Sequence, residues 1–386
     1  MRKTICGIST LPGTVKAFML NNLSYMAQNG YDSYVMCNAD DSLSDETLFP
    51  IRYIPIKMKW GNVSLFEVIK QVHYMKKVFK KERFDIIQYA TSNAALYASI
   101  AGWLARVPVR IHLQWGIAYP EYHGLKRWFY RSLEKLTSML STSVQPDSKA
   151  NLKYSIQDNL FKESKGEVLY NGSACGVDLS KYDITKRNEW RNEIRELCNI
   201  PHQAKVFGFV GRVVVEKGIN ELLSAFLRIQ DSNVCLLIVG PLDDVNRLDQ
   251  NLYQKAIQSS HVVFTGCVSS AAKYFAAMDF LLLPSYREGF GMTVLEAAGV
   301  GTPSIVSNIK GPTDFVKDDI NGIICEVKSS DSLLYAMNKA LNMDEDAYRK
   351  MCNNAYCIVK RDFDSEQFKV LFYKNREYLL SLSKHS

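Results

Sequence analysis

The chain has 386 residues, of which 47% are hydrophobic and 23% charged, so its composition is that of a soluble globular protein. This length exceeds what one hydrophobic core usually holds, and two domains of ordinary size are expected. The longest weakly polar run, 94–105, has about half the length that a membrane-spanning helix needs. No signal peptide precedes the first strand-like run, and we therefore expect the protein in the cytoplasm.

Nine cysteines are scattered along the chain, with no Cys-x-x-Cys pair and no partnering histidines. Several lie in apolar strand-like runs, for example Cys235 and Cys325, where a free cysteine acts as a small hydrophobic residue. A zinc site or a disulfide framework is therefore not expected.

The net charge of +7 is carried by the first half of the chain. Residues 1–180 hold 22 Lys and Arg against 15 Asp and Glu, while the remainder holds 25 of each. A basic half can be an ordinary solvated face, and it also suits an anionic acceptor or an anionic membrane surface. Nucleic acid is not among the partners we expect.

Strand-like and helix-like segments alternate through both halves, which is typical of α/β proteins with parallel sheets. In the first half the predicted strands are 3–9, 32–38, 50–56, 84–89, 109–116, 142–144 and 168–170, and the predicted helices are 15–29, 63–81, 94–105 and 125–140. In the second half the predicted strands are 206–210, 234–239, 262–265, 280–283, 304–306 and 322–325. We place the domain boundary near 180.

The stretch 279–316 has the most specific pattern in the chain. A short apolar strand, 280–283, is followed by a glycine-containing turn, 286–291, and by a helix, 292–300, that Gly301 and Pro303 end. A second strand begins at Ser304. The helix N-terminus presents free backbone N–H groups to the turn, and such a terminus suits a phosphate.

Two carboxylates, Glu288 and Glu296, bracket this turn, so both can face one ligand at the N-terminal end of the helix. Each also has an ordinary structural interpretation. Glu296 completes a Ser/Thr-x-x-Glu capping box that begins at Thr293, in which it would only satisfy a backbone N–H. Glu288 can be a solvated turn residue.

These residues resemble a known signature. The pattern Pro284-Ser285-x-x-Glu288-Gly289-Phe290-Gly291-x-x-x-x-Glu296-Ala297, followed by Gly301-Thr302-Pro303, resembles the glutamate-x7-glutamate motif of glycosyltransferase family 4. The upstream segment 206–219, which contains Gly211-Arg212 and Lys217-Gly218, resembles a second element of that family, and the turn 171–178 resembles a third. Members of the family are retaining enzymes of the GT-B fold.

The resemblance implies an α/β protein with two Rossmann-like parallel-sheet domains that face each other across a cleft. Residues 1–180 would form the acceptor-side domain, completed by a terminal helix at 366–386, and residues 181–365 would form the nucleotide-sugar-binding domain. It also implies that no metal and no other cofactor is required. UDP is the donor nucleotide most frequent in the family, with GDP as the alternative.

The site residues follow from the same resemblance. Arg212 and Lys217 would hold the donor diphosphate, Glu288 would hold sugar hydroxyls near the anomeric carbon, and Glu296 would bind the ribose. The expected catalytic residues are Arg212, Lys217 and Glu288. The other expected donor-binding residues are Gly13, Gly211, Val268, Gly289, Phe290, Gly291, Met292 and Thr293.

On the acceptor side, Trp115-Gly116 stands where family members often carry His-Gly. His112 lies three residues earlier and should point to the opposite face of its strand, since strand side chains alternate. His112 is therefore either a substrate contact or a satisfied core histidine. Trp115 would supply a stacking wall for a sugar ring or a lipid-linked acceptor.

The predicted helix 125–140 combines Lys126, Arg127, Arg131 and Lys135 with Trp128, Phe129 and Leu133. An amphipathic helix of this kind can lie on an anionic membrane surface, and it can equally pack its apolar stripe into the domain. In the first case the protein would be peripheral on the inner face of the cell membrane.

The function that these observations favour is sugar transfer from a nucleotide diphosphate donor to a lipid-linked or glycan acceptor during surface polysaccharide synthesis. Two alternatives stay open. One is a UDP-sugar epimerase of the same fold. The other is a non-catalytic nucleotide-sugar-binding partner subunit, which the replacement of the usual histidine by Trp115 leaves open. A dehydrogenase is disfavoured because no Gly-x-Gly-x-x-Gly follows the first strand.

Overall fold

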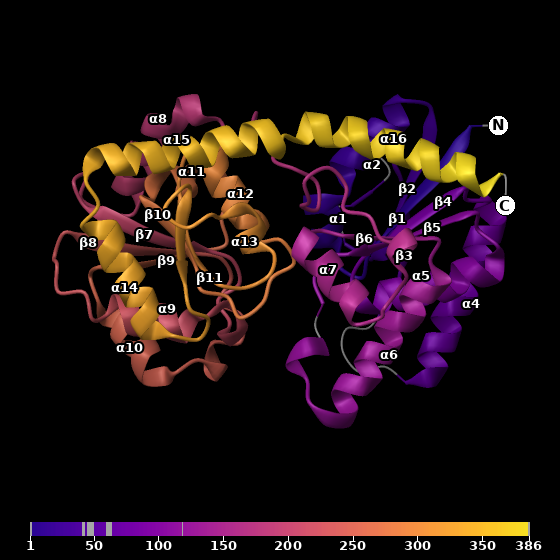
Figure 1. The fold of residues 1–386 in the computed structure, drawn as a ribbon, viewed down its shortest axis with the longest axis horizontal. Coiled ribbons are helices and arrows are strands. Elements are labelled where there is room, and N and C mark those ends of the chain that lie inside the picture. Colours follow the sequence, from indigo (N-terminus) through magenta and orange to yellow (C-terminus); the bar gives the residue numbers. More distant parts are fainter. Residues whose placement is uncertain (1, 41–42, 45–49, 59–63, 118, 385–386) are drawn as a thin grey trace. The chain divides into compact units, whose positions relative to one another are not determined.

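The structure is a computed structural model that describes residues 2–40, 43–44, 50–58, 64–117 and 119–384. Its chain separates into two compact units (Figure 1). Unit 1 consists of Met1–Cys175 together with Glu366–Ser386, and unit 2 consists of Gly176–Ser365. The first boundary lies five residues before the expected position near 180.

Unit 1 contains a six-stranded sheet in the order β3-β2-β1-β4-β5-β6, in which all neighbours pair in parallel. Its strands are β1 (Lys3–Ile8), β2 (Tyr31–Asn38), β3 (Arg52–Ile56), β4 (Ile86–Tyr89), β5 (Val109–Gln114) and β6 (Ser143–Pro146). Its helices are α1 (Pro12–Phe18), α2 (Leu20–Gln28), α4 (Leu65–Glu82), α5 (Ser92–Ala105), α6 (Gly124–Leu140), α7 (Lys149–Gln157) and α16 (Ser365–Ser383).

Unit 2 contains a second parallel sheet of six strands in the order β12-β11-β10-β7-β8-β9. Its strands are β7 (Lys205–Val210), β8 (Val234–Val239), β9 (Val262–Gly266), β10 (Phe280–Leu283), β11 (Ser304–Ser307) and β12 (Gly322–Cys325). Its helices are α8 (Arg187–Leu197), α9 (Ile219–Phe226), α10 (Gln250–Gln258), α11 (Ala271–Ala277), α12 (Met292–Gly299), α13 (Pro312–Phe315), α14 (Ser330–Leu341) and α15 (Glu345–Asp362).

Each sheet is covered on both faces, which explains why its strands read as continuous apolar runs. In unit 1, one face packs against α1, α2 and α16, and the other packs against α4 and α5. In unit 2, one face packs against α8, α11, α12 and α15, and the other packs against α9, α10 and α14. No helix in the described part of the chain is both long and apolar enough to cross a bilayer.

In unit 1 one predicted helix is interrupted and one predicted strand was wrong. The helix expected at 15–29 is divided into α1 and α2 at Met19, whose φ of −110° departs from helical geometry. The strand expected at 168–170 is absent from the described residues, where only Gly166 forms a single bridge to Val144. Tyr170 has a φ of +56°, in the left-handed region, which an extended strand cannot accommodate.

Both sheets have the same topology, because the strand order of unit 2 is that of unit 1 when its own strands are counted from β7. In such a sheet the chain reverses its direction of travel between the first and fourth strands, and ligands bind outside the carboxyl ends of the strands at that point. The switch points lie between β1 and β4 in unit 1 and between β7 and β10 in unit 2. The two motifs of the second half follow β7 and β10 directly.

Candidate active site

The loops that follow β7 and β10 touch each other at the switch point of unit 2. Gly218 has a φ of +72°, and a Cβ there would lie 2.1 Å from the carbonyl oxygen of Pro284. The backbone N–H of Tyr286 donates to the carbonyl of Glu216 at 3.0 Å. Only glycine permits this approach, which fixes the loop ending in Lys217-Gly218 against the loop beginning at Pro284.

The close approach brings together two residues that stand 71 positions apart in the sequence. The ammonium of Lys217 donates to Oε1 of Glu288 at 2.6 Å, and the hydroxyl of Ser285 donates to the same oxygen at 2.7 Å. The side chains of Lys217 and Glu288 are 24% and 12% exposed. A partly buried ion pair with one additional hydrogen bond, here from Ser285, holds its carboxylate more firmly than an exposed pair does.

Helix α12 begins beside this pair. Its N-cap is Gly291, at a φ of +84°, and no side chain of the described residues caps the helix. Its first turn holds no acidic residue. The backbone N–H groups of Gly291, Met292 and Thr293 therefore lie at a helix terminus that suits an anionic group.

Gly289 also lies close to a neighbouring segment. A Cβ added at Gly311, whose φ is +94°, would lie 2.0 Å from the carbonyl oxygen of Gly289. The loop before α12 is thus fixed by two close backbone approaches, Gly218 against Pro284 and Gly311 against Gly289.

Glu296 is the fifth residue of α12 and is half-buried. The capping-box interpretation was wrong, because the N-cap is Gly291 and Thr293 already lies inside the helix. Burial raises the pKa of the Glu296 carboxyl to about 7, against an opposing hydrogen bond with Tyr182. A carboxyl with such a pKa, one turn from a helix N-terminus, can exchange a proton near neutral pH.

The remaining predicted residues of unit 2 lie around these loops. Arg212 is exposed, and its side chain has no hydrogen bond or ion pair with the described residues. The backbone at Gly211 is approached closely by Gly240, where a Cβ would lie 2.0 Å from the Gly211 carbonyl oxygen. Val268 follows β9 and is half-buried. The side chain of Phe290 is only 2% exposed and belongs to the core, so only its backbone can face a ligand.

Three predicted residues lie in unit 1. Gly13 is the second residue of α1, directly after β1. His112 is buried in β5, where its ring stacks on Tyr89 and Nε2 lies 3.8 Å from Oε1 of Glu134 in α6. Burial lowers the pKa of His112, and the charge of Glu134 opposes this shift. His112 is therefore buried in the core, but its Nδ1 has no hydrogen-bond partner among the described residues, so it is not the satisfied core histidine of the second interpretation.

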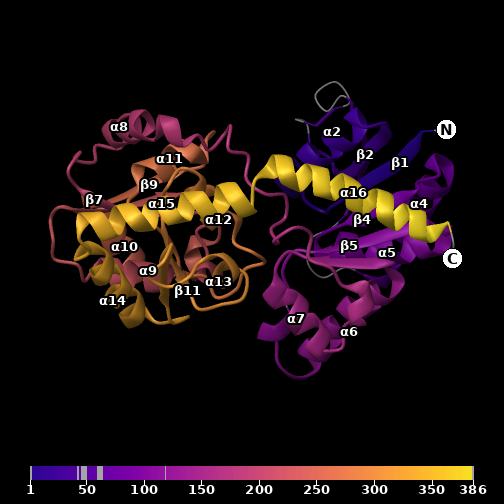
Figure 2. The same cartoon turned by 45° about the horizontal axis from the view of Figure 1, so that its top comes forward.

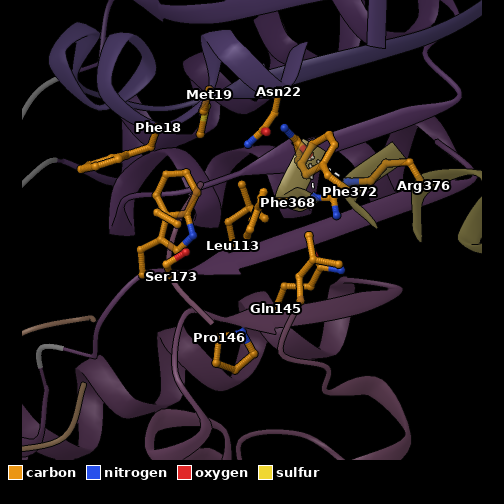
Figure 3. A pocket seen from close by; sticks show the side chains of 14 residues that line it. Phe18, Met19, Asn22, Leu113, Gln145, Pro146, Ser173, Phe368, Phe372 and Arg376 are labelled. Carbon is orange, nitrogen blue, oxygen red and sulfur yellow. Dashed lines mark hydrogen bonds between the residues drawn. The ribbon is translucent and has the colours of Figure 1, made fainter. Parts of the chain in front are cut away.

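Trp115 lies on the other face, as the alternation of side chains predicted. Its ring meets Phe18 edge-on, with ring centroids 5.6 Å apart. Figure 3 shows the small pocket that these rings help to enclose, with Phe368, Phe372 and Arg376 of α16 on its far side. Its free space of about 20 Å³ is enough for one water molecule. Trp115 thus lines this pocket while its side chain stays only partly buried, and its role as a stacking wall remains a prediction.

The floor of this pocket is polar. The guanidinium of Arg376 is fully buried, lies 3.7 Å from the ring centroid of Phe372, and donates to Oε1 of Gln88 and to Oδ1 of Asn375. Burial lowers the pKa of Arg376 to about 9. Oδ1 of Asn22 is buried there without a hydrogen-bond partner among the described residues. The amide oxygen of Asn22 is therefore a suitable acceptor for a water molecule enclosed in the pocket.

Sequence reasoning missed two residues of the unit 2 site. Ser285 is fully buried and bonds to Glu288, and its Ser-x-x-Glu spacing was a local signal that could have indicated this contact. Tyr182 bonds to Glu296 from 114 positions away, and no local pattern indicates it.

Known proteins give the same assignment for the two halves of the chain. The family model described as "Glycosyl transferases group 1" matches residues 191–357, and the "Glycosyl transferase 4-like domain" model matches residues 13–172. The capsular polysaccharide biosynthesis glycosyltransferase CapM of Staphylococcus aureus is 28% identical over 350 residues, 90% of each chain. An Escherichia coli protein, named UDP-Gal:alpha-D-GlcNAc-diphosphoundecaprenol alpha-1,3-galactosyltransferase, is 25% identical over 90% of this chain and 91% of its own.

Among solved structures, HepE of Anabaena in complex with UDP superposes with a TM-score of 0.78 at 19% identity, over 98% of this chain and 100% of its own. WaaG, a glycosyltransferase of lipopolysaccharide biosynthesis, gives a TM-score of 0.74 at 17% identity, over 97% of this chain and 99% of its own. These structures share the two-domain Rossmann-like fold. The chain therefore belongs to the GT-B glycosyltransferases of the family 4 type.

Proposed function

We propose that this protein transfers a sugar from a UDP-sugar to a lipid-linked acceptor in surface polysaccharide synthesis, with retention of the anomeric configuration. The observation that carries the proposal is the Lys217–Glu288 ion pair beside the N-terminus of α12, at the switch point of unit 2. A diphosphate and the sugar attached to it need a cation, free N–H groups and a carboxylate within a short span. This arrangement offers all three.

The departing diphosphate gains charge as its bond to the sugar breaks. That charge would be stabilised by Lys217, by the N–H groups at the start of α12 and by the guanidinium of Arg212, which has no partner among the described residues. Glycine-fixed loops favour this role, because groups that are already oriented need no reorganisation during the reaction. The ammonium of Lys217 has three N–H donors, and one of them bonds to Glu288. The other two can bind phosphate oxygens.

Glu288 would hold sugar hydroxyls near the anomeric carbon. Its Oε1 already accepts bonds from Lys217 and Ser285, so Oε2 is the oxygen that a hydroxyl would reach. In a retaining transfer the bond from the anomeric carbon to the diphosphate breaks and the acceptor oxygen bonds on the same face. The proton of the acceptor hydroxyl would pass to the leaving phosphate, and no separate general base is assigned.

The names of relatives support the choice of donor and acceptor. The Escherichia coli relative is named for UDP-Gal and a diphosphoundecaprenol acceptor. Solved structures of HepE contain UDP and UDP-glucose. A Corynebacterium glutamicum relative, 24% identical, is named as GDP-mannose-dependent, which makes GDP the alternative for this chain.

A lipid-linked acceptor places the reaction at a membrane, and helix α6 supports a peripheral position there. Along it Leu125, Trp128, Phe129, Leu136 and Met139 form an exposed apolar stripe, each between 37% and 85% exposed. Four basic residues and one glutamate give the helix a net charge of +3. An exposed apolar stripe with flanking cations suits an anionic bilayer.

A thermal-shift series tests the donor assignment first. UDP at about a hundred times its dissociation constant should stabilise the protein by about 2.7 kcal/mol. Since 1 kcal/mol corresponds to about 2–4 °C for domains of this size, the melting temperature should rise by roughly 5–11 °C. The shift should be absent with NAD and lost in Lys217→Ala. A shift with GDP and none with UDP would mean that the donor nucleotide is GDP. The absence of a shift with either nucleotide would contradict the proposed phosphate site. Release of UDP in the presence of a diphosphoundecaprenol-linked sugar would then test transfer.

A further inference from the structure

Two helices of unit 1 begin with clusters of exposed apolar side chains. The first five residues of α4 include Leu65, Phe66 and Ile69, and the first six of α6 include Leu125, Trp128 and Phe129. All six side chains are between 52% and 85% exposed. Single exposed apolar residues are normal on a soluble protein, whereas contiguous clusters of large ones mark an interaction surface.

The topology places both clusters at one edge of unit 1. Each helix follows a parallel strand, α4 after β3 and α6 after β5, so both helices begin near the carboxyl edge of the sheet. Helix α5 packs against both of them and lies between them (Figure 2). The two clusters therefore flank the start of α5, which follows β4 at the switch point.

The charge of this helix layer fits an anionic partner. Helix α4 has five lysines and two glutamates, and α6 has four basic residues and one glutamate, so each has a net charge of +3. Lys70 lies beside the apolar cluster of α4 and has no hydrogen bond or ion pair with the described residues, whereas the other four lysines of α4 lie in its C-terminal half. On α6, Lys126 and Arg127 lie in the first turn, beside the apolar cluster. On α6 the glutamate, Glu134, is already engaged by Gln114.

We propose that the N-terminal turns of α4 and α6 are two anchors of one membrane-docking face, which inserts into an anionic bilayer and turns the carboxyl edge of the unit 1 sheet toward it. The inference rests on the proposed peripheral position of α6 and extends it with a second anchor and an orientation. One anchor leaves the domain free to rotate about it, whereas two anchors fix which edge faces the lipid. The edge so presented is the one at which an open α/β sheet binds its ligands.

Vesicle co-sedimentation of the full chain tests the two anchors separately. The probes are vesicles of phosphatidylcholine alone and of phosphatidylcholine mixed with phosphatidylglycerol. We expect binding to the mixed vesicles to weaken roughly tenfold or more in Leu65→Ser/Phe66→Ser/Ile69→Ser, and by a similar factor in Leu125→Ser/Trp128→Ser/Phe129→Ser. Vesicles without the anionic lipid should bind the wild type more weakly, because each lysine near the surface adds to the attraction.

Helix α5 provides a matched control. Trp103 and Leu104 are also exposed, at 55% and 40%, but they lie at its C-terminal end and thus at the opposite edge of the sheet. Trp103→Ser/Leu104→Ser should bind mixed vesicles as the wild type does. An equal loss in this control would overturn the orientation.

Other outcomes separate this inference from the proposed function. If only the α6 variant loses binding, α6 docking stands and the second anchor is wrong. If the wild type does not bind mixed vesicles, the face is not a lipid surface and the inference fails. It also fails if light scattering shows that the variants change the oligomeric state, since the face would then be a protein interface. UDP binding, which we assign to unit 2, should be the same in every variant. Its loss would indicate that a triple variant is misfolded. The single substitution Phe66→Ser would then replace the triple variant in the vesicle experiment.

Discussion

The two switch points of this molecule have the same topology and different chemistry. In unit 2 the loops after β7 and β10 are joined by the Lys217–Glu288 ion pair. In unit 1 the loops after β1 and β4 are joined by hydroxyls, because Oγ1 of Thr91 accepts from the N–H of Thr10 at 2.9 Å and its one proton can go to Oγ1 of Thr10 or to the carbonyl of Ala90. The fold therefore supplies the same location twice, and the loop sequence decides whether charge is placed there.

This contrast indicates that the two switch points suit different ligands. A site with a lysine, a carboxylate and an uncapped helix terminus is suited to a charged donor, whereas one lined with neutral hydroxyls is suited to a neutral or weakly charged group. Thr91 supports a special role for the second site, since it is a β-branched residue at a φ of +64°, a conformation that costs about 1–3 kcal/mol and is usually found at functional positions.

The largest effect is expected from removal of the charged pair. Lys217→Ala and Glu288→Gln should each lower kcat by about 10²–10³-fold, because each removes a group that is oriented before the reaction starts. The melting temperature should change little, since the loops are also held by backbone contacts at Gly218 and Tyr286. Steady-state release of UDP and thermal unfolding measure the two effects.

A matched ion pair provides the control. Lys273 and Glu193 lie 2.6 Å apart, as Lys217 and Glu288 do, but their side chains are 36% and 46% exposed and lie on α11 and α8. Lys273→Ala should leave turnover at the wild-type level. Wild-type turnover in Lys217→Ala or Glu288→Gln would show that the charged switch point is not the reaction site.

The second effect concerns the glycine that lets the unit 2 loops meet. Gly218→Ala should lower the free energy of unfolding by about 2–4 kcal/mol, because its φ of +72° strains an L side chain and the new Cβ would meet the Pro284 carbonyl. Gly266 separates the two causes, since its φ is +68° but nothing lies within 4 Å of a Cβ there. Gly266→Ala should cost only about 1–2 kcal/mol. Equal losses in urea unfolding would mean that the close approach contributes nothing.

Much of this arrangement could be predicted from the sequence. The strands of unit 2 are continuous apolar runs, and the segment 280–304 has local signals for strand, turn and helix, so its elements were predicted within a residue or two. The pairing of Lys217 with Glu288 was not visible as a contact, because it depends on strand order. Similarly, Tyr182 reaches Glu296 across 114 positions, and the divided helix at Met19 has no glycine or proline to mark it. Long-range contacts are set by topology, which local patterns do not encode.

The third effect is a pH dependence at Glu296. Its folded pKa, about 7, lies above the ordinary value of 4.5, so the folded state binds a proton more tightly than the unfolded state. The free energy of unfolding should therefore fall as pH rises from about 4.5 to 7 and stay constant above that range.

Donor binding should have the opposite sign. If ribose hydroxyls donate to the ionised carboxylate, UDP affinity should rise as pH rises through about 7 and weaken by up to about tenfold per pH unit below it. Calorimetric titration with UDP, over roughly 1.5 pH units on either side of that value, measures this dependence. Glu296→Gln should remove both dependences. A UDP affinity that stays pH-dependent in the variant would assign the titration to another group.

The smallest effect is expected at the switch point of unit 1, where Gly13 is the counterpart of Gly218. Gly13 lies inside α1, has no positive φ, and nothing lies within 4 Å of a Cβ built there. Gly13→Ala should raise the free energy of unfolding by about 0.5–1 kcal/mol. The fold itself thus gives no reason for a glycine at this position. If turnover falls in the more stable variant, the added methyl group occupies space that a substrate needs, and Gly13 belongs to the binding surface. If turnover is unchanged, Gly13 has to be removed from the site, and the close approach of backbone to ligand is confined to unit 2.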